Sequence, residues 1–438
     1  MTLPVHHLFI TDHDPEGCDS LMSISESELV YDWNRCKGAE PKPARGTVEL
    51  NDETLRDGLQ SPSVRSPSIE EKLEILHFMA ELGIHSANIG LPGAGPHVVQ
   101  DVRRLAREIG DCGLSLAPNC AARTLRQDID PIVDIVQETG VEIEVACFLG
   151  SSPIRQYTEG WDLDRLVRLT EEAVSFAVGR GLPVMYVTED TTRAAPDDID
   201  RLYTTAVEAG ARRVCVADTV GHATPEGVRN LVAFVRKVVD RTGENVKVDW
   251  HGHNDRGLSI VNSLVAAEAG ADRLHGTALG IGERVGNTPI DLLMVNLRLL
   301  GWSDNGLERL PDYCRRVSEC TGVPMPDNYP VVGKDAFRTG TGVHAAAIIK
   351  AREKGDDWLA DRIYSGVPAS LVGRRQTIEI GPMCGRSNVV YWLGERGYAP
   401  DEKLIELIFD HAKKASRVLE EADVRALCSA AGATPQTS

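Results

Sequence analysis

The chain has 438 residues, of which 42% are hydrophobic and 26% charged, so it could form one large domain with appendages or two to three average domains. Its 65 acidic and 47 basic residues give a net charge of −18, which excludes the basic balance typical of nucleic-acid-binding proteins. No apolar run approaches the roughly 20 residues that cross a bilayer, and the acidic N-terminus lacks a secretory signal. We therefore expect a cytoplasmic protein without nucleic-acid or membrane partners.

Ten cysteines are spread along the chain without a C-x-x-C pair, which indicates reduced thiols rather than a disulfide framework. Cys120, Cys147 and Cys215 lie in or beside apolar runs. They are predicted to be small core residues rather than catalytic thiols.

Residues 1–45 are acidic, contain four prolines and are predicted to be irregular, with one short helix near 25–33. Two interpretations of this extension remain open. It is either a disordered tail or an arm that packs on a partner subunit.

From residue 47 to about residue 300, short β-rich runs alternate with amphipathic helical stretches. The expected strands are 47–50, 85–90, 114–117, 141–148, 184–187, 213–217, 246–250 and 273–277, and the helices between them include 69–82, 162–179, 197–209, 225–241 and 258–269. Eight strand–helix units in about 250 residues predict an α/β fold, the (β/α)8 TIM barrel. The alternative, a doubly wound sheet, usually has a glycine-rich phosphate loop after its first strand, and none is present here.

After residue 300 the pattern changes to that of a smaller, α-rich module. The expected elements are helices at 307–320, 342–353, 401–415 and 416–431, a linker at 364–371, an apolar run at 376–380 and a turn at 383–388. The predicted organisation is an N-terminal extension (1–45), a catalytic TIM barrel (46–300) and an α-rich C-terminal subdomain (301–438).

Two short stretches contain the residue types of a metal site. Arg56 and Asp57 follow the first strand, and His251 and His253 end the seventh, where positions two apart point to one side. Imidazoles suit Zn, Mn, Fe or Ni, and a carboxylate with waters also admits Mg. Three protein ligands leave room for a chelating substrate. Taken singly, the two histidines could be polar residues at a strand end and Asp57 a turn cap.

Other strand ends carry further candidates. A glycine-rich turn, 280–287, follows the eighth strand, and Asn287 at its end is predicted to orient or complete the metal shell. Glu189 closes the fifth strand as a candidate buried base, with Arg193 shortly after it, and Thr219 follows the sixth strand as a donor to a substrate carboxylate. Each could singly cap a helix, but capping alone does not explain why all lie at the same end of different strands.

Three motifs resemble the signatures of the DRE-TIM metallolyases, namely Arg56-Asp-Gly-Leu-Gln60, His251-Gly-His-Asn254 and Gly280-Ile-Gly-Glu-Arg-Val-Gly-Asn287. Within that superfamily the chain is most similar to the Claisen-condensing branch, the 2-isopropylmalate, homocitrate and citramalate synthases. The resemblance covers residues 47–398, and 341–344, Tyr364 and 387–389 are similar to the post-barrel subdomain of this branch.

The resemblance implies a divalent metal (Mg, Mn or Zn) bound by Asp57, His251 and His253, with acetyl-CoA and a 2-oxo acid as substrates. The candidate catalytic residues are Arg56, Glu189, His344 and Tyr364, and the candidate substrate-binding residues are Gln60, Asn88, Thr219 and Arg193. His344 and Tyr364 would come from the partner subunit, which implies a homodimer.

Three positions depart from the family pattern. The family usually has a carboxylate after its second strand, where this chain has Asn88, and a histidine on its fourth, where it has Ala146; Leu59 stands where a polar residue is frequent. An amide in place of a carboxylate suits an oxo acid with an extra anionic group, and lineage drift explains it equally well. About 75 residues follow Tyr364, too few for the usual leucine-sensing domain, so leucine feedback is not expected.

The expected reaction is a metal-dependent Claisen condensation of acetyl-CoA with a 2-oxo acid, of the 2-isopropylmalate synthase type found in leucine biosynthesis. Homocitrate, citramalate or phosphonomethylmalate synthase activity is the alternative within the branch. A second alternative is an acyl-CoA lyase of the hydroxymethylglutaryl-CoA lyase type, although residues 279–287 lack the reactive cysteine typical of that relative. A third is a non-catalytic barrel that kept the fold.

Overall fold

The computed structural model describes residues 26–34 and 41–436, and its internal contacts divide the chain into two units, Met1–Pro41 and Lys42–Ser438. The described part of the first unit contains one short helix, α1 (Glu26–Leu29), within the stretch where a helix is predicted. Residues 1–25 and 35–40 of the predicted extension lie outside the described residues.

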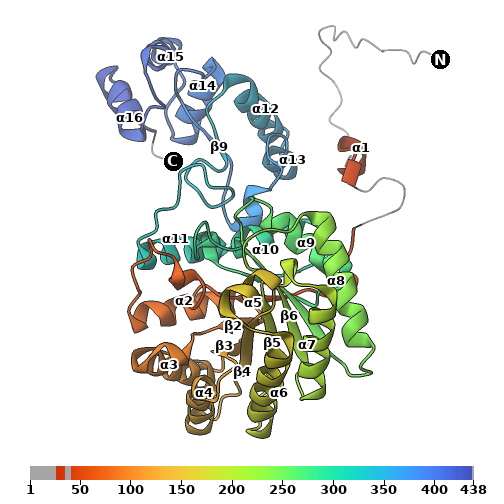
Figure 1. Cartoon of the computed structure of the whole chain (residues 1–438). Coiled ribbons are helices and arrows are strands. Elements are labelled where there is room, and N and C mark those ends of the chain that lie inside the picture. Colours follow the sequence, from red (N-terminus) through yellow and green to blue (C-terminus); the bar gives the residue numbers. More distant parts are fainter. Residues whose placement is uncertain (1–25, 35–40, 437–438) are drawn as a thin grey trace, which may run out of the picture. The chain divides into compact units, whose positions relative to one another are not determined.

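The second unit is built around a closed barrel of parallel strands (Figure 1). Its strands are β1 (Glu49–Asp52), β2 (Ser86–Asn88), β3 (Ala117–Arg123), β4 (Glu144–Gly150), β5 (Val184–Glu189), β6 (Arg213–Asp218), β7 (Lys247–Gly252) and β8 (Arg273–Gly276). Strands adjacent in sequence pair with one another, and β1 pairs with β8 to close the barrel. The predicted TIM barrel is therefore confirmed, and the doubly wound sheet is excluded.

Five strands, β1, β2, β3, β4 and β7, begin one to three residues later than predicted. β1 continues two residues past the apolar run, because its polar residues Glu49 and Asn51 point into a barrel whose interior is polar. β3 begins at Ala117, where the expected strand ends. The apolar residues Leu114 and Leu116 pack against the core just before β3, while the strand itself consists mostly of small residues.

Helices cover the outside of the barrel (Figure 1). They are α2 (Ile69–Glu81), α3 (Pro96–Cys112), α4 (Arg126–Thr139), α5 (Pro153–Glu159), α6 (Leu163–Gly179), α7 (Pro196–Glu208), α8 (Pro225–Asp240), α9 (Ser259–Ala269) and α10 (Ile290–Leu299). The main hydrophobic core lies between strands and helices and includes the fully buried Tyr186, Tyr203 and Trp250. Within the described residues, no helix is long and apolar enough to span a membrane.

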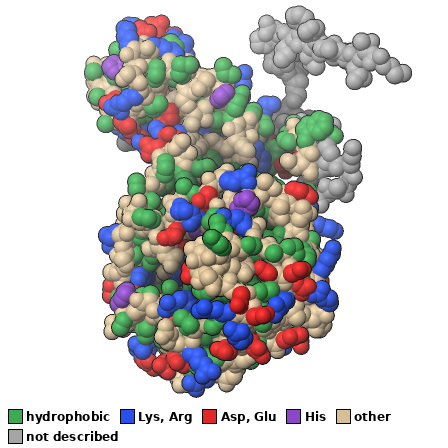
Figure 2. Space-filling view, viewed as in Figure 1, with side chains coloured by type: hydrophobic (Ala, Val, Ile, Leu, Met, Phe, Trp, Pro, Cys, Tyr) green, Lys and Arg blue, Asp and Glu red, His purple; other side chains and the backbone are tan. Residues whose placement is uncertain are grey.

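Acidic and basic side chains are interspersed on the face shown in Figure 2. Some of them form exposed ion pairs between neighbouring helices, such as Arg201 of α7 with Asp164 of α6 at 2.9 Å. Pairs of this kind stabilise a fold by at most about 1 kcal/mol each.

The part after the barrel is helical, as predicted. It contains α11 (Leu310–Thr321), α12 (Gly342–Glu353), α13 (Asp357–Arg362), α14 (Arg386–Glu395), α15 (Glu402–Lys414) and α16 (Glu421–Ala430), with the short paired strands β9 (Arg338–Thr339) and β10 (Thr377–Ile378). The predicted turn at 383–388 runs into α14. The barrel core continues past residue 300 through α11 to Val332 and Val372, and the division of the chain at residue 300 remains our proposal.

Helix α11 is joined to β1 by a buried polar contact. The Tyr313 hydroxyl donates to Asp52 Oδ2 (2.5 Å) and lies 3.1 Å from Thr54 Oγ1. Burial raises the pKa of Asp52 to about 6, although hydrogen bonds from Thr54 and Tyr313 oppose the shift.

We predict that Tyr313→Phe costs about 1–3 kcal/mol of unfolding free energy, because a buried carboxylate loses a donor. Losing this donor raises the pKa of Asp52 in the folded variant further. A carboxyl group with a raised pKa in the folded state favours folding only while it is protonated, so this stability is lost as the pH rises through that pKa. The cost should therefore increase between about pH 5 and pH 8 in urea unfolding. The exposed Tyr157→Phe is the control, and a cost independent of pH would contradict the assignment.

Candidate functional site

A cavity of about 250 Å³ lies at the C-terminal ends of the barrel strands. Its wall consists of side chains that face the barrel interior and of residues just after the strands. Eight of the predicted site residues line it, namely Arg56, Asp57, Gln60, Asn88, Glu189, Thr219, His251 and His253. The structure brings these eight together, and their chemical roles remain predictions.

Asp57, His251 and His253 form a group that could hold a metal ion. Asp57 Oδ2 lies 3.4 Å from His251 Nε2 and 3.7 Å from His253 Nε2. Ligand atoms about 2.1 Å from one shared ion, at angles of roughly 90–110°, are separated by about 3.0–3.4 Å. The observed spacing is close to that range. The alternation of side chains along β7 places both imidazoles on this side.

The protonation and surroundings of these residues also fit a cation. Burial, assisted by the neighbouring His251, lowers the pKa of His253 to about 4, so its imidazole is neutral at pH 7. Asn287 is bridged to His253 through the backbone, and its buried Oδ1 has no hydrogen-bond partner among the residues described. A neutral imidazole and a free carbonyl oxygen are ligand types that divalent ions accept.

The glycines of the turn before Asn287 are required by the turn itself. A Cβ on Gly286 would lie 1.8 Å from Gly280 O, and one on Gly282 would lie 2.2 Å from Asn287 Nδ2. Both glycines have positive φ angles, 90° and 155°. The glycines therefore let the turn fold onto itself and place Asn287.

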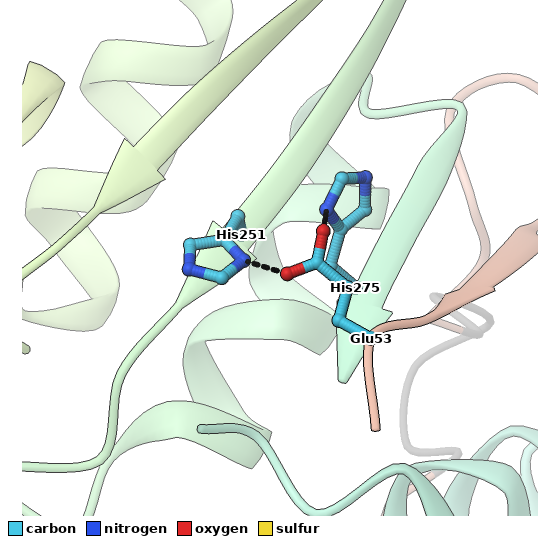
Figure 3. Close-up of side chains that lie close together, drawn as sticks. All are labelled: Glu53, His251 and His275. Carbon is cyan, nitrogen blue, oxygen red and sulfur yellow. Dashed lines mark ion pairs between the residues drawn. The ribbon is translucent and has the colours of Figure 1, made fainter. Parts of the chain in front are cut away.

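Glu53 is a buried carboxylate in the wall of the cavity that the sequence analysis did not identify. Oε1 accepts a hydrogen bond from Asn51 Nδ2 (3.2 Å) and lies 3.0 Å from His275 Nδ1. Two further groups contact Oε2, Arg56 Nη2 at 2.6 Å and His251 Nδ1 at 3.1 Å (Figure 3). Burial alone would raise the pKa of Glu53, but Arg56 and the two imidazoles outweigh it and hold the pKa well below its ordinary value.

His275 links Glu53 to a charged layer deeper in the barrel. Its Nε2 lies 2.9 Å from Asp249 Oδ2, and Asp249 also accepts from Arg213 (2.7 Å) and Arg273 (2.6 Å). Burial would raise the pKa of Asp249, but the two guanidinium groups hold it well below its ordinary value. The carboxylates of β7 and β1 are thus connected through one imidazole of β8. A signal for this layer was present in the sequence, because polar residues alternate at 49, 51 and 53 and at 273 and 275.

Arg56 and Asn88 present unpaired donors to the cavity region. The Arg56 Nε is buried and has no hydrogen-bond partner within the described part of the chain, and the same holds for Asn88 Nδ2. Gly90 N donates to Asn88 Oδ1 (3.3 Å), which fixes the amide so that its NH2 group is the free end. Ala121 and Ala146 line the same cavity, so the position where the resemblance suggests a histidine is open space here.

Glu189 and Thr219 lie at the rim formed by β5 and β6. Burial raises the pKa of Glu189, and Arg155, 4.0 Å away, opposes the shift only in part. The Thr219 hydroxyl accepts from Asp190 N (2.8 Å), so its own hydrogen remains available to a ligand. Cys215 also lines the cavity, but burial raises the pKa of its thiol well above the ordinary value, which keeps it protonated.

Four predicted site residues do not line this cavity, and one of them, Asn287, lies beside it next to His253. Arg193 forms an ion pair with Asp190 (2.7 Å) and lines a neighbouring groove of about 220 Å³, which also contains Glu189 and Thr219. His344, on α12, and Tyr364, after α13, are both exposed and stack with their ring centroids 4.2 Å apart. They do not line the cavity of their own chain.

Comparisons with known proteins agree on one family. The sequence model of a family described as HMGL-like matches residues 47–311. Homocitrate synthase AksA of Methanopyrus kandleri is 36% identical over 84% of this chain and 87% of that protein. The probable 2-isopropylmalate synthase of the same organism is 35% identical over 84% of this chain and 69% of that protein. Its putative (R)-citramalate synthase CimA is 32% identical over 87% and 72%.

Among solved structures, the HMG-CoA lyase of Bacillus subtilis matches with a TM-score of 0.55 at 18% identity. The match covers 66% of this chain and 97% of the lyase chain. At this identity the match shows a shared fold and carries no argument about the reaction.

The buried charge layer predicts a large cost for Asp249→Asn. The substitution leaves two buried guanidinium groups without their shared anion, and we expect a loss of about 3–5 kcal/mol of unfolding free energy in urea or thermal unfolding. Asp164→Asn breaks the exposed ion pair with Arg201 and should cost less than about 1 kcal/mol. Equal small costs for the two variants would contradict the structural importance of the layer.

Proposed function

The chain belongs to the HMGL-like family, and we propose that it condenses acetyl-CoA with a 2-oxo acid in a metal-dependent Claisen reaction. The observation that carries the proposal is the convergence of Asp57, His251 and His253 beside Arg56 in one cavity. The relatives that support it are synthases named for three different products.

We assign the metal to Asp57, His251 and His253, with Asn287 orienting or completing the shell. A bound Mg, Mn or Zn ion would polarise the ketone of a chelating 2-oxo acid as a Lewis acid. The remaining steps depend on residues of the chain itself.

Arg56 is placed to bind the oxo acid and to stabilise the negative charge that develops on its ketone oxygen, because its buried Nε is free. Thr219, Gln60 and Asn88 line the same cavity and are proposed to bind the rest of the oxo acid. Arg193 lines the adjoining groove, where an extended substrate would reach it.

Glu189 is our candidate for proton transfer from the acetyl-CoA methyl group, because burial raises its pKa toward the range useful to a base. Loss of that proton gives an enolate, whose carbon forms a bond with the ketone carbon of the oxo acid. The alkoxide is then protonated, and water hydrolyses the thioester to a carboxylate and free CoA. The product is a 2-hydroxy-2-alkyl dicarboxylic acid.

His344 and Tyr364 are proposed to act in the cavity of a partner subunit, so that the enzyme is a homodimer. Both side chains have acid–base capacity. In their own chain they are exposed and stack on each other. Catalytic residues outside their own chain's cavity are consistent with a site completed by a second copy.

The proposed oxo acid is 2-oxoisovalerate, as in 2-isopropylmalate synthases, which would place the enzyme in leucine biosynthesis. A homocitrate synthase activity is the second candidate, favoured by the 36% identity to AksA. Acyl-CoA cleavage of the lyase type is the rival reaction, and the turn at 279–287 has no cysteine for it.

The reaction is tested by thiol release from acetyl-CoA against 2-oxoisovalerate, pyruvate, 2-oxoglutarate, oxaloacetate and a phosphonate analogue. One oxo acid should release CoA, and chelation of the metal should abolish release until Mn²⁺ or Mg²⁺ is restored. Asp57→Asn should lower turnover more than about 100-fold, beyond the usual effect of losing an outer partner of a metal site. Undiminished turnover without metal, or acyl-CoA cleavage without synthesis, would overturn the proposal.

Assembly is tested by co-expression of an Asp57→Ala chain with a His344→Ala chain that carries a different tag. Each homodimer should be inactive, whereas each hybrid dimer should contain one intact site. Random pairing should therefore restore about one quarter of the wild-type activity. Hybrids as inactive as the parent variants would place His344 outside the partner's site.

A further inference from the structure

The Glu53 carboxylate contacts both halves of the proposed site. Oε2 lies 3.1 Å from Nδ1 of His251, a candidate metal ligand (Figure 3). The same oxygen accepts from Nη2 of Arg56, the candidate substrate clamp, at 2.6 Å. The Glu53 side chain is only 3% exposed. A single carboxylate thus fixes the distance between the two groups.

The oxygens of Glu53 are surrounded by polar groups of the protein. Four of these groups lie within 3.2 Å, and two of them, Asn51 Nδ2 and Arg56 Nη2, donate hydrogen bonds to Oε1 and Oε2. Glu53, His251 and His275 also form a group that could hold a metal ion. We assign the ion to Asp57, His251 and His253 instead, because Glu53 already pairs with the Arg56 guanidinium at 2.6 Å. The effect of Glu53 on the ion must then pass through its neighbours.

The contact with His251 selects one tautomer of that imidazole. An ionised carboxylate can only accept, so the nitrogen 3.1 Å from it carries the proton, and that nitrogen is Nδ1. The other nitrogen, Nε2, faces Asp57 Oδ2 at 3.4 Å and is the one left to bind an ion. A bare ring nitrogen is the form that binds a metal.

The position of Glu53 is itself fixed from below. His275 lies between Glu53 Oε1 (3.0 Å) and Asp249 Oδ2 (2.9 Å), and Asp249 is held by two arginines. The carboxylates of Glu53 and Asp249 outweigh the burial of His275 and raise its pKa, which favours the doubly protonated ring that such a bridge needs. The charged layer thus acts as a support for the metal site.

We propose that Glu53 is a positioning residue that holds the Nδ1–H tautomer of His251, and with it the bare Nε2 that the metal requires. The proposal rests on the metal site assigned under the proposed function. It concerns metal binding in the absence of substrate, so its test is independent of which reaction the protein catalyses.

The tautomer is measured directly in the full-length chain. The protein is labelled with 15N-histidine, freed of metal with a chelator, and its imidazole nitrogens are recorded by two-bond proton–nitrogen correlation. The signals of His251 are identified by their loss in His251→Gln. At a pH where the ring carries a single proton, the wild type should hold that proton on Nδ1, and Glu53→Gln should show a mixture of tautomers. A wild-type His251 protonated on Nε2 would overturn the proposal without any variant at position 53.

Metal affinity is the second measurement. Mn²⁺ is titrated into the metal-free protein and the free ion is followed by its EPR signal. Glu53→Gln should weaken Mn²⁺ binding by about 10–100-fold, the usual effect of losing an outer partner of a ligating histidine. Unchanged affinity in a folded Glu53→Gln variant would overturn the proposal.

The matched control is Glu49→Gln. Glu49 begins β1, four residues before Glu53 and on the same inward side, and it contacts Arg213 at 3.2 Å rather than the proposed ligands. It should keep both the wild-type tautomer and the wild-type Mn²⁺ affinity. An equal loss in the control would show a general effect of removing a barrel carboxylate and would refute a specific role for Glu53.

Discussion

Asp249 lies between Arg213 and Arg273 inside the barrel, and the polar interior is built upward from this contact. Burying these charges separately would be prohibitive, whereas a paired and hydrogen-bonded cluster can be tolerated. The cluster extends through His275 to Glu53 and from there to the cavity. Ion pairs and hydrogen bonds therefore fix the charged side chains inside the barrel, whereas the main apolar core lies outside the strands.

Parallel strands bring this column to the site without any special loop. Residues two apart on β7 share a face, so Asp249, His251 and His253 run from the charged layer to the metal group. Closure of β1 onto β8 then places Glu53 beside His275. The charged layer and the proposed metal ligands are consequently connected. A substitution at Asp249 would act on the ligands through the side chains of His275 and Glu53.

The sequence was sufficient for the fold and for the residues that recognisable motifs carry. Strand–helix alternation predicted the barrel, and Asp57, His251 and His253 were readable from their places at strand ends. Glu53 and His275 were missed because one follows a short strand and the other lies in one, and their partnership exists only after β1 meets β8. The start of β3 was misplaced because small residues form the strand, whereas apolar character marked the segment before it. His344 and Tyr364 remain a different case, since no contact within one chain assigns them a site.

The charged layer also has a consequence for the route by which the chain folds. Arg213 of β6 contacts Glu49 of β1, Glu144 of β4 and Asp249 of β7, so its partners come from widely separated parts of the sequence. A partly assembled sheet lacking β7 would leave the guanidinium groups of Arg213 and Arg273 without the Asp249 carboxylate that both contact. Half-formed barrels are thus unfavourable folding intermediates, because the buried charges find their partners only when the barrel closes. The charged layer therefore makes folding of the barrel more cooperative, although its side chains take no part in the proposed reaction.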